Sequence, residues 1–342
     1  MLRMKAYHAG IFRNSAEMIA DKVVLDVGTG TGVLAVWAAK AGAKHVYAVD
    51  ASHAHHYAEQ LVYSEGVSDK VTVLHAKIEE IDIPQPVDII ISEWMGVFLI
   101  KESMFDSVAY ARDKWLKPGG LLLPSAATIE LGLYTPDKDY DHTDFVRKNL
   151  ERERMEWKKT VTDLRRLDVD YSALTDELEQ ELSDHHLKNA IRANYLSADN
   201  LAANSQQILA FDCNTVAPTD LIQFSKEFDF TVTRRTEVRG FLGWFTVQFP
   251  NGVVLDTGPK PIYNHWGQQL YPLEESLQVA PGDHVTGTIR VQRDPLEPRL
   301  NIVEFTYQVG NGPRHTARFN MNTVENMGRG SRSYMFGHGD KA

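Results

Sequence analysis

The sequence predicts an α/β domain built on a parallel sheet, then an antiparallel β domain that carries an inserted helical arm. Three observations divide the 342 residues in this way. In the first third, short apolar runs alternate with helical patterns. From about residue 138 to 204 the chain becomes densely charged. After Gln206, stretches of period 2 between Gly- and Pro-containing turns indicate a sandwich or barrel.

The first domain is expected at residues 1–124. Its predicted strands read as nearly continuous apolar runs: KVVLDV, HVYAVD, KVTVLHA, VDIIISE and GGLLLPS. Strands of this kind are buried on both faces, so we expect helices on both sides of the sheet.

The β domain is expected at 125–322, with the arm inserted at about 138–204 and a flexible, Gly- and Ser-rich tail at 323–342. One face of the arm's helical pattern carries four apolar residues: Leu150, Trp157, Val161 and Leu164. Such a face either covers its own domain or binds another chain, and periodicity alone leaves both interpretations open.

The charge balance excludes some classes of partner. There are 36 Lys and Arg residues against 46 Asp and Glu, a net charge of −10, which argues against direct nucleic-acid binding and suits a cationic partner. The single cysteine, Cys213, excludes an internal disulfide and is interpreted as a small core residue. No apolar run reaches the roughly 18 residues of a membrane span, and the first residues lack a signal-peptide pattern. We therefore expect a cytoplasmic or nuclear protein with no membrane partner.

A glycine turn follows the first predicted strand. Gly28, Gly30 and Gly32 come after Asp26, and glycine lets the backbone approach a ligand closely. A dinucleotide fingerprint needs a third glycine at the position of Val33. The pattern therefore favours the version of this fold that binds S-adenosylmethionine.

The next predicted strand ends at Asp50, roughly 20 residues after the first glycine, where a carboxylate can bind both ribose hydroxyls. A methyl group on a sulfonium is electrophilic without a metal. His53 and His56 share a helical face but lack a third suitably spaced ligand, so we expect no metal site.

Two glutamates, Glu93 and Glu102, bracket the apolar loop SEWMGVFLIKESM. Because burying an unpaired charge costs much free energy, we expect these carboxylates to bind a cation. They could act as general acid and base, chelate a metal, or cap a loop in solvent. A guanidinium fits them well, because its planar fork of N–H donors matches carboxylates. Drawing its charge toward the carboxylates would leave another nitrogen better able to attack a methyl carbon.

SEWMGVFLIKESM resembles the double-glutamate loop of the protein arginine N-methyltransferases, and PIYNHWGQQLY resembles their Thr-His-Trp loop. RMKAYHAGI, KESMFDSV, GFLGWFTVQF and HWGQQ are most similar to the plant-type branch called arginine methyltransferase ten. The resemblance covers nearly the whole chain. It implies a Rossmann-like methyltransferase domain, a β barrel and a dimerisation arm. It also implies type I activity, giving mono- and asymmetric dimethylarginine on histone tails or Arg-Gly-rich RNA-binding proteins.

The resemblance also implies roles for individual residues. Glu93, Glu102 and His265 would be catalytic, with Met104 and Trp266 lining the same cleft. The residues implied at the cofactor are Arg3 on its carboxylate, Asp26, Gly28 and Gly30 at the nucleoside, Asp50 on the ribose and Glu79 near the adenine.

A head-to-tail homodimer is implied as well, with the arm docked on the partner's first domain. The sequence departs from the family at three places. The family's aromatic lid segment would precede Arg3, but the sequence starts two residues before it, so we expect weak cofactor retention. Asn264 replaces the Thr of the Thr-His-Trp loop, and Asp50 replaces a common Glu.

Two other functions stay open. A catalytically impaired scaffold or regulatory subunit would self-associate without binding the cofactor or turning over substrate. A small-molecule methyltransferase fits the first domain equally well, but it leaves the barrel, the arm and the paired glutamates unexplained.

Overall fold

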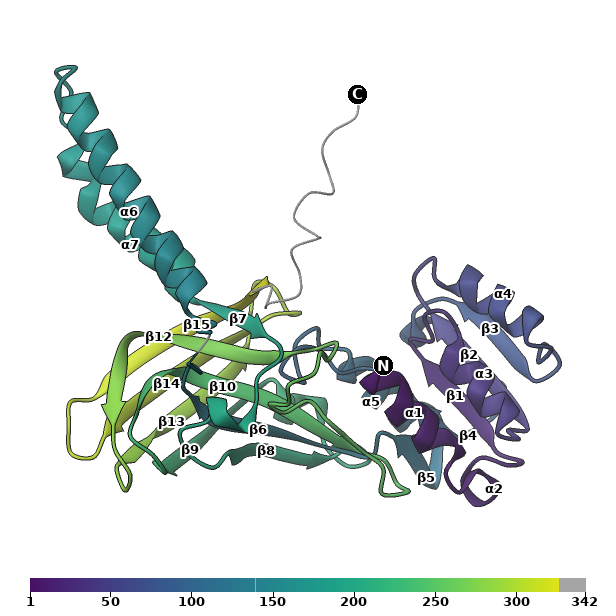
Figure 1. Ribbon diagram of the computed structural model, residues 1–342. Helices are drawn as coiled ribbons and strands as arrows, with labels where there is room; N and C mark the ends of the chain where they lie inside the picture. Colours follow the sequence, from purple (N-terminus) through teal and green to yellow (C-terminus); the bar gives the residue numbers. More distant parts are fainter. Residues whose placement is uncertain (139, 326–342) are drawn as a thin grey trace.

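The computed structural model describes residues 1–138 and 140–325, which form two domains and a projecting helical hairpin (Figure 1). No helix in this described part is long and apolar enough to cross a membrane. Of the predicted tail, residues 323–325 end the last strand, and 326–342 lie outside the described residues.

The first domain holds a parallel five-stranded sheet, as predicted, in the order β3-β2-β1-β4-β5. Its strands are β1 (Val23–Val27), β2 (His45–Asp50), β3 (Val71–His75), β4 (Val87–Ile91) and β5 (Leu116–Leu123). All five residues of β1 are buried, which fits a strand covered on both faces. The chain runs outward from β1 through β2 to β3 and returns to the other side of β1 at β4. Ligands of open α/β sheets bind where the order reverses in this way, beyond the carboxyl ends of β1 and β4.

Helices cover this sheet and connect its strands. They are α1 (Leu2–Phe12), α2 (Ser15–Met18), α3 (Val33–Lys40), α4 (His55–Ser64), η1 (Ile78–Glu80) and α5 (Phe105–Trp115). Helix α3 packs against α1 and α4, whereas α5 packs against β4, β5 and η1.

The second domain is a nearly closed β barrel, as predicted, in the order β8-β6-β10-β12-β7-β15-β14-β13-β9. Its strands are β6 (Ala126–Tyr134), β7 (Asn189–Ala193), β8 (Gln206–Asp212), β9 (Gln223–Thr231), β10 (Thr236–Gln248), β11 (Val254–Asp256), β12 (Gln268–Val279), β13 (His284–Arg293), β14 (Asn301–Val309) and β15 (His315–Glu325). Two short helices, η3 (Ala198–Asn200) and η4 (Pro218–Leu221), connect strands. The edge strands β8 and β9 meet where the side chain of Gln206 bonds to the backbone of Asp229 in both directions. Rings fill the interior, where Phe241 stacks on Phe305 at 4.3 Å.

The domains are joined by polar contacts and close packing. Arg293 of β13 binds both carboxylate oxygens of Asp106 on α5, at 2.7 and 3.0 Å. Helix α1 lies so close to the barrel that a Cβ on Gly10 would meet the ring of Phe249 at 2.4 Å. These contacts fix the edge of the first sheet relative to the barrel.

Cys213 is free and buried, as predicted, and burial raises the pKa of its thiol to about 12.

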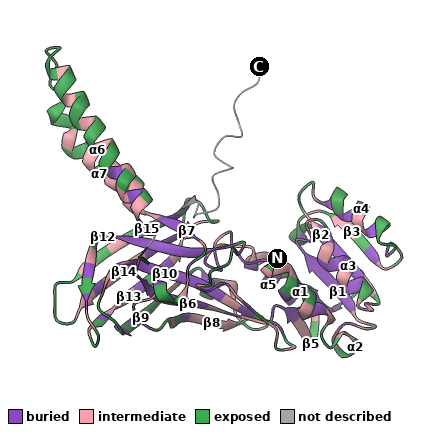
Figure 2. Ribbon diagram, viewed as in Figure 1, coloured by how far each residue is buried: buried purple, intermediate pink, exposed green. Residues whose placement is uncertain are grey.

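The arm consists of α6 (Asp144–Arg165) and α7 (Thr175–Leu187), with η2 (Tyr171–Leu174) between them. The range predicted for the arm also includes β7 and η3, which belong to the barrel. The predicted apolar face of α6 turns toward α7, where the Trp157 indole donates to Thr175. The hairpin therefore covers that face itself, while most of its remaining surface is exposed (Figure 2).

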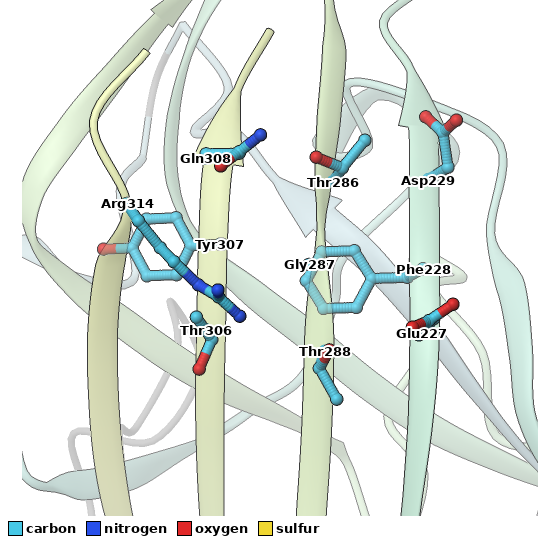
Figure 3. A pocket seen from close by; sticks show the side chains of 10 residues that line it. All are labelled: Glu227, Phe228, Asp229, Thr286, Gly287, Thr288, Thr306, Tyr307, Gln308 and Arg314. Atoms are coloured by element: carbon cyan, nitrogen blue, oxygen red, sulfur yellow. The ribbon is translucent and has the colours of Figure 1, made fainter. Parts of the chain in front are cut away.

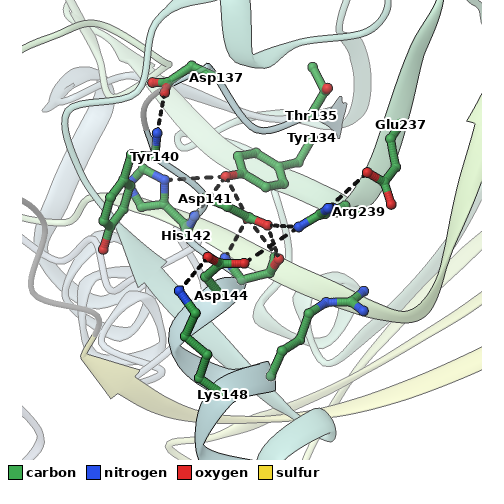
Figure 4. Close-up of polar contacts among 12 residues, drawn as sticks. Tyr134, Thr135, Asp137, Tyr140, Asp141, His142, Asp144, Lys148, Glu237 and Arg239 are labelled. Atoms are coloured by element: carbon green, nitrogen blue, oxygen red, sulfur yellow. Dashed lines mark hydrogen bonds and ion pairs between the residues drawn. The ribbon is translucent and has the colours of Figure 1, made fainter.

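An acidic cluster around Arg239 of β10 holds the base of the arm (Figure 4). Arg239 binds Asp141, lies 3.6 Å from Asp144 and donates to Glu237 at 2.9 Å. The nearly buried Asp141 carboxylate also accepts from the Thr143 amide at 2.8 Å, just before α6 begins. One guanidinium therefore links the carboxylates at the start of α6 to strand β10.

Arg239→Met should lower the free energy of unfolding by about 2–4 kcal/mol, because it leaves the nearly buried Asp141 carboxylate without its cation. Urea denaturation followed by circular dichroism measures this change. Lys148→Met removes an exposed partner of Asp144 and serves as the control, with no measurable change expected. If the two variants unfold at the same urea concentration, the cluster does not stabilise the base of the arm.

Candidate active site

The glycine turn follows β1 at the edge where the sheet order reverses. Gly28, Gly30 and Gly32 all have positive φ, between 56° and 83°, which side chains rarely adopt. A Cβ on Gly32 would meet Ala58 of α4 at 2.9 Å, so this glycine serves helix packing. A Cβ on Gly30 would meet nothing within 4 Å. The space above Gly30 is therefore open to a ligand.

Two of the predicted cofactor carboxylates, Asp50 and Asp26, contact this turn, whereas the third, Glu79, bonds to α5. Asp50, at the end of β2, accepts from the Gly30 amide at 2.7 Å and from the Ser52 amide at 2.8 Å. Glu79 in η1 accepts from the Ser107 hydroxyl at 2.7 Å. Asp26 is fully buried and accepts from Thr29 at 2.6 Å, and burial raises the pKa of its carboxyl to about 7. Asp26 thus supports the turn from below, whereas Asp50 lies beside the open space.

The loop after β4 carries both predicted glutamates and an unusual backbone. Four non-glycine residues in this loop have positive φ: Phe98, Leu99, Glu102 and Ser103. Such conformations cost about 1–3 kcal/mol each and persist only where surrounding structure imposes them. Here the amides of Gly96 and Leu99 bond to each other's carbonyls at 2.9 and 3.0 Å.

The barrel imposes the rest of this loop's shape. The Trp266 indole donates to the Met95 carbonyl at 2.7 Å. The amide of Glu102 donates to the Arg299 carbonyl at 2.7 Å, and the Ser103 hydroxyl donates to the Pro298 carbonyl at 2.6 Å. The position of Glu102 therefore depends on the turn between β13 and β14.

Glu93 stands just beyond β4 and is largely buried. Its Oε2 accepts from Nη1 of Arg3 at 2.8 Å, whereas its buried Oε1 has no hydrogen-bond partner among the described residues. Burial raises the pKa of the Glu93 carboxyl to about 7, although Arg3 opposes this rise and Glu102 adds to it. The effect of Glu102 shows that the structure brings the two predicted carboxylates into electrostatic range.

Glu102 and Met104 are the other predicted residues of this loop. Glu102 is half exposed and lies 3.4 Å from a guanidinium nitrogen of Arg299. The Met104 methyl would be 3.6 Å from a Cβ on Gly28, so Met104 links the glutamate loop to the glycine turn.

His265 and Trp266 have different environments. His265 is an exposed residue, but part of its imidazole is covered. This partial burial lowers the pKa of the imidazole, and the charges of Arg3 and Arg192 lower it further, so the neutral form predominates at pH 7. Trp266 was expected to line the cleft, but only 3% of its surface is exposed and its ring packs on Phe245 at 5.2 Å. The structure places Trp266 beneath the glutamate loop, as a support for it.

Asn264 explains one departure from the family pattern. Its side-chain oxygen accepts from the amides of Trp266 at 3.0 Å and Gly267 at 2.7 Å. Asn forms such local turns readily, so it organises this loop in place of Thr.

Sequence reasoning missed the residues of both domains that support the site. Pro298 and Arg299 hold the loop through backbone carbonyls, and any residue type provides such a group. Arg192 donates to the carbonyls of His265 and Trp266. Tyr7 of α1 donates to the Ser92 carbonyl at 2.7 Å. No local sequence pattern reveals contacts between residues so far apart in the chain.

His53 and His56, the two histidines weighed as metal ligands, belong to a small group of neighbouring rings. The rings of His55 and His75 lie 3.7 Å apart, and His53 and His56 flank them. Within residues 1–138 and 140–325, no group of three or more His, Cys, Asp or Glu side chains is arranged to hold a metal ion.

A separate recess of about 480 Å³ lies on strands β9, β13 and β14 of the barrel (Figure 3). Glu227 and Asp229 line one side of it, Thr286 lies on the strand between, and Arg314 lies on the opposite side. It shares no lining residue with the glutamate site.

Two family models match the chain: the arginine methyltransferase oligomerization subdomain at residues 142–312 and a methyltransferase domain at 24–120. Protein arginine N-methyltransferase PRMT10 of rice (Oryza sativa subsp. japonica) is 36% identical over 90% of this chain and 82% of its own length. Protein arginine N-methyltransferase 1 of Schizosaccharomyces pombe is 38% identical over 84% of this chain and 78% of its own length.

Solved structures of protein arginine methyltransferases have the same fold as this chain. Protein arginine methyltransferase 10 of Arabidopsis thaliana superimposes with a TM-score of 0.86 and 32% identity, covering 94% of both chains. The Trypanosoma brucei PRMT1 enzyme-prozyme complex with AdoHcy gives a TM-score of 0.77 and 28% identity, covering 94% of this chain and 95% of that one. These matches confirm the resemblance inferred from the sequence, including its plant-type branch. This chain belongs to the protein arginine N-methyltransferase family.

Proposed function

We propose that this chain transfers methyl groups from S-adenosylmethionine to the guanidinium nitrogens of protein arginines, as a type I enzyme that gives mono- and asymmetric dimethylarginine. One observation carries the proposal. The partly buried Glu93, at the point where the sheet order reverses, binds a guanidinium in this structure, that of Arg3, and a second carboxylate lies within electrostatic range. The site therefore has the chemistry needed to hold an arginine.

The residues present fit this cofactor. The open space above Gly30 lies beside the Asp50 carboxylate, which suits a nucleoside whose ribose needs acceptors. Arg3, at the same edge, suits an anionic group. When bound, S-adenosylmethionine supplies an electrophilic methyl group.

The chain's own residues would prepare the nucleophile. Glu93 and Glu102 accept N–H bonds from the substrate guanidinium, hold it in one orientation and draw its positive charge toward the nitrogens that they contact. The remaining nitrogen is then the better nucleophile. The neutral His265 imidazole can accept the proton that this nitrogen loses.

The net charge of −10 supports a cationic substrate such as a histone tail or an Arg-Gly-rich segment, because the summed field attracts it. The enzyme-prozyme complex of the trypanosome relative is an observation that favours the scaffold alternative. Against it, both glutamates and the open glycine turn are present here. A small-molecule methyltransferase would not require Glu102 to be positioned by the barrel.

We also propose a homodimer in which each arm docks on its partner's first domain. At the tip of the arm, Leu167 is 71% exposed and Leu174 is 47% exposed. The first domain offers a recess of about 310 Å³ that includes Phe12, Val33 and Trp37. The recess is largely apolar, with Lys40 and Glu65 at its lining, and the two leucines of the tip suit such a surface.

Glu93→Gln should lower kcat by about two to four decades, since a half-paired guanidinium costs a few kcal/mol. Methylarginine formed on an Arg-Gly-rich peptide is quantified by mass spectrometry. Glu80→Gln, an exposed carboxylate in η1, is the matched control and should keep normal turnover. Near-normal turnover in Glu93→Gln would remove Glu93 from the mechanism.

The rate should depend on pH through Glu93. Because burial raises the pKa of its carboxyl to about 7, the ionised form that binds guanidinium is lost as pH falls through that value. The kcat/KM for peptide should therefore decline on the acid side near pH 7. In Glu102→Gln the decline should move to lower pH, because Glu102 raises the pKa of Glu93. A decline at unchanged pH in this variant would show that another group titrates.

Leu167→Asp should convert the dimer to a monomer, because a charge would have to enter an apolar recess. Size-exclusion chromatography with light scattering reports the mass. Thr160→Asp adds the same charge at an exposed polar position of α6 and should leave the dimer intact. A Leu167→Asp variant that stays dimeric at micromolar concentration would contradict docking through the tip.

A further inference from the structure

Two tyrosines beside the glutamate site expose their rings to solvent. Tyr195 lies just after β7 and is 49% exposed, and Tyr263 lies two residues before His265 and is 55% exposed. Their ring centroids are 6.3 Å apart, and Ile262, next to Tyr263 in the chain, is 47% exposed. Scattered exposed apolar residues are ordinary, but a group of them beside a binding site indicates a contact surface.

The backbone holds Tyr195 in place. Its φ of 62° is uncommon for a bulky residue and persists only where the surrounding structure imposes it. The preceding residue, Asn194, is anchored twice: the His142 ring donates to its carbonyl at 3.1 Å, and its side-chain oxygen accepts from the Asn264 amide at 3.1 Å. The following residue, Leu196, is fully buried. A fixed turn therefore presents the Tyr195 ring at the surface.

Bonds between β7 and the loop of His265 connect these tyrosines to the glutamate site. Arg192 of β7 donates to the carbonyls of His265 and Trp266. Partial burial and then the charge of Arg3 lower the pKa of the His265 imidazole, so His265 lies within electrostatic range of the guanidinium that binds Glu93. Residues that flank an arginine held by Glu93 would therefore lie near the tyrosines.

The surroundings favour an aromatic side chain over a second cation at this place. Tyrosine rings pack well against another ring, and their faces also attract cations. Arg192, however, already brings a positive charge here. Burial, and after it the charge of Arg192, lower the pKa of the Lys101 amine in the glutamate loop, although Glu102 opposes this change. A second cation of the substrate would meet these two basic side chains, whereas an aromatic ring meets no such repulsion.

We propose that Tyr195, Tyr263 and Ile262 form a subsite that binds an aromatic side chain flanking the target arginine. This inference rests on the proposed function and specifies its substrates. The glutamates recognise the guanidinium by charge, and the subsite adds an apolar anchor beside it. Arg-Gly-rich segments that contain aromatic residues are therefore better substrates than lysine-rich histone tails.

Calorimetric titration of short peptides into the full chain tests the subsite. The parent peptide is Gly-Gly-Gly-Arg-Gly-Gly-Gly, and Phe or Lys replaces one glycine at a time, with S-adenosylhomocysteine present at saturation. We expect Phe to tighten binding about 10-fold at one or two positions, and Lys to give no gain at the same positions. The proposal is overturned if Phe gives no gain at any position, or if Lys gains as much as Phe.

Variants of the two tyrosines provide an independent arm. Tyr263→Ala and Tyr195→Asn should each reduce the gain from Phe to about 2-fold or less. Asn tolerates the left-handed backbone at position 195, so that variant keeps the turn. Tyr263→Phe retains the ring and should retain the gain.

Tyr63→Ala is the matched control, because it removes a tyrosine that is 81% exposed on α4, and it should retain the full gain. A gain that survives both Tyr263→Ala and Tyr195→Asn would show that the aromatic side chain binds elsewhere.

Failure of this inference differs from failure of the proposed function. Methylarginine formation with no preference for aromatic neighbours contradicts only the subsite. An absence of binding for every peptide, with S-adenosylhomocysteine still bound, contradicts both.

Discussion

The site depends on a strained loop that neither domain could hold alone. Four left-handed residues between β4 and α5 would relax without an external constraint. The barrel supplies that constraint through Trp266, Pro298 and Arg299, whose groups bond to the loop. Glu93 is placed by the sheet and Glu102 by the barrel, so their separation is set by the fit between the two domains.

This dependence explains why so many contacts join the domains close to the site. Arg293 of the barrel binds Asp106 at the start of α5, only a few residues beyond Glu102. On the other side, Asn251 of the barrel donates to carbonyls at the end of α1, the helix that carries Arg3. Small movements between the domains would change the distance between the carboxylates, and these bonds resist them.

Sequence reasoning recovered whatever follows from local pattern. Strand period, glycine spacing and the rule that ligands bind at strand ends placed Asp50 and Glu93 at one edge, and the structure agrees. It could not reveal that Trp266 lies beneath the loop, because its bond to Met95 spans 171 residues. Nor could helical periodicity show whether the apolar face of α6 meets α7 or another chain. The structure assigns that face to α7 and leaves a different apolar surface at the arm's tip.

The electrostatics of the site follow from the same geometry. Burial of Glu93 raises the pKa of its carboxyl to about 7, and repulsion from the Glu102 carboxylate adds to this rise. A neutral ligand would leave that cost in place, whereas the guanidinium of the proposed substrate would lower it by pairing with both carboxylates. The site therefore discriminates by charge and by the planar fork of donors, and lysine, with its compact ammonium, meets only part of this requirement. Under the proposed function, selectivity for arginine would arise from the position of Glu102, which the barrel fixes.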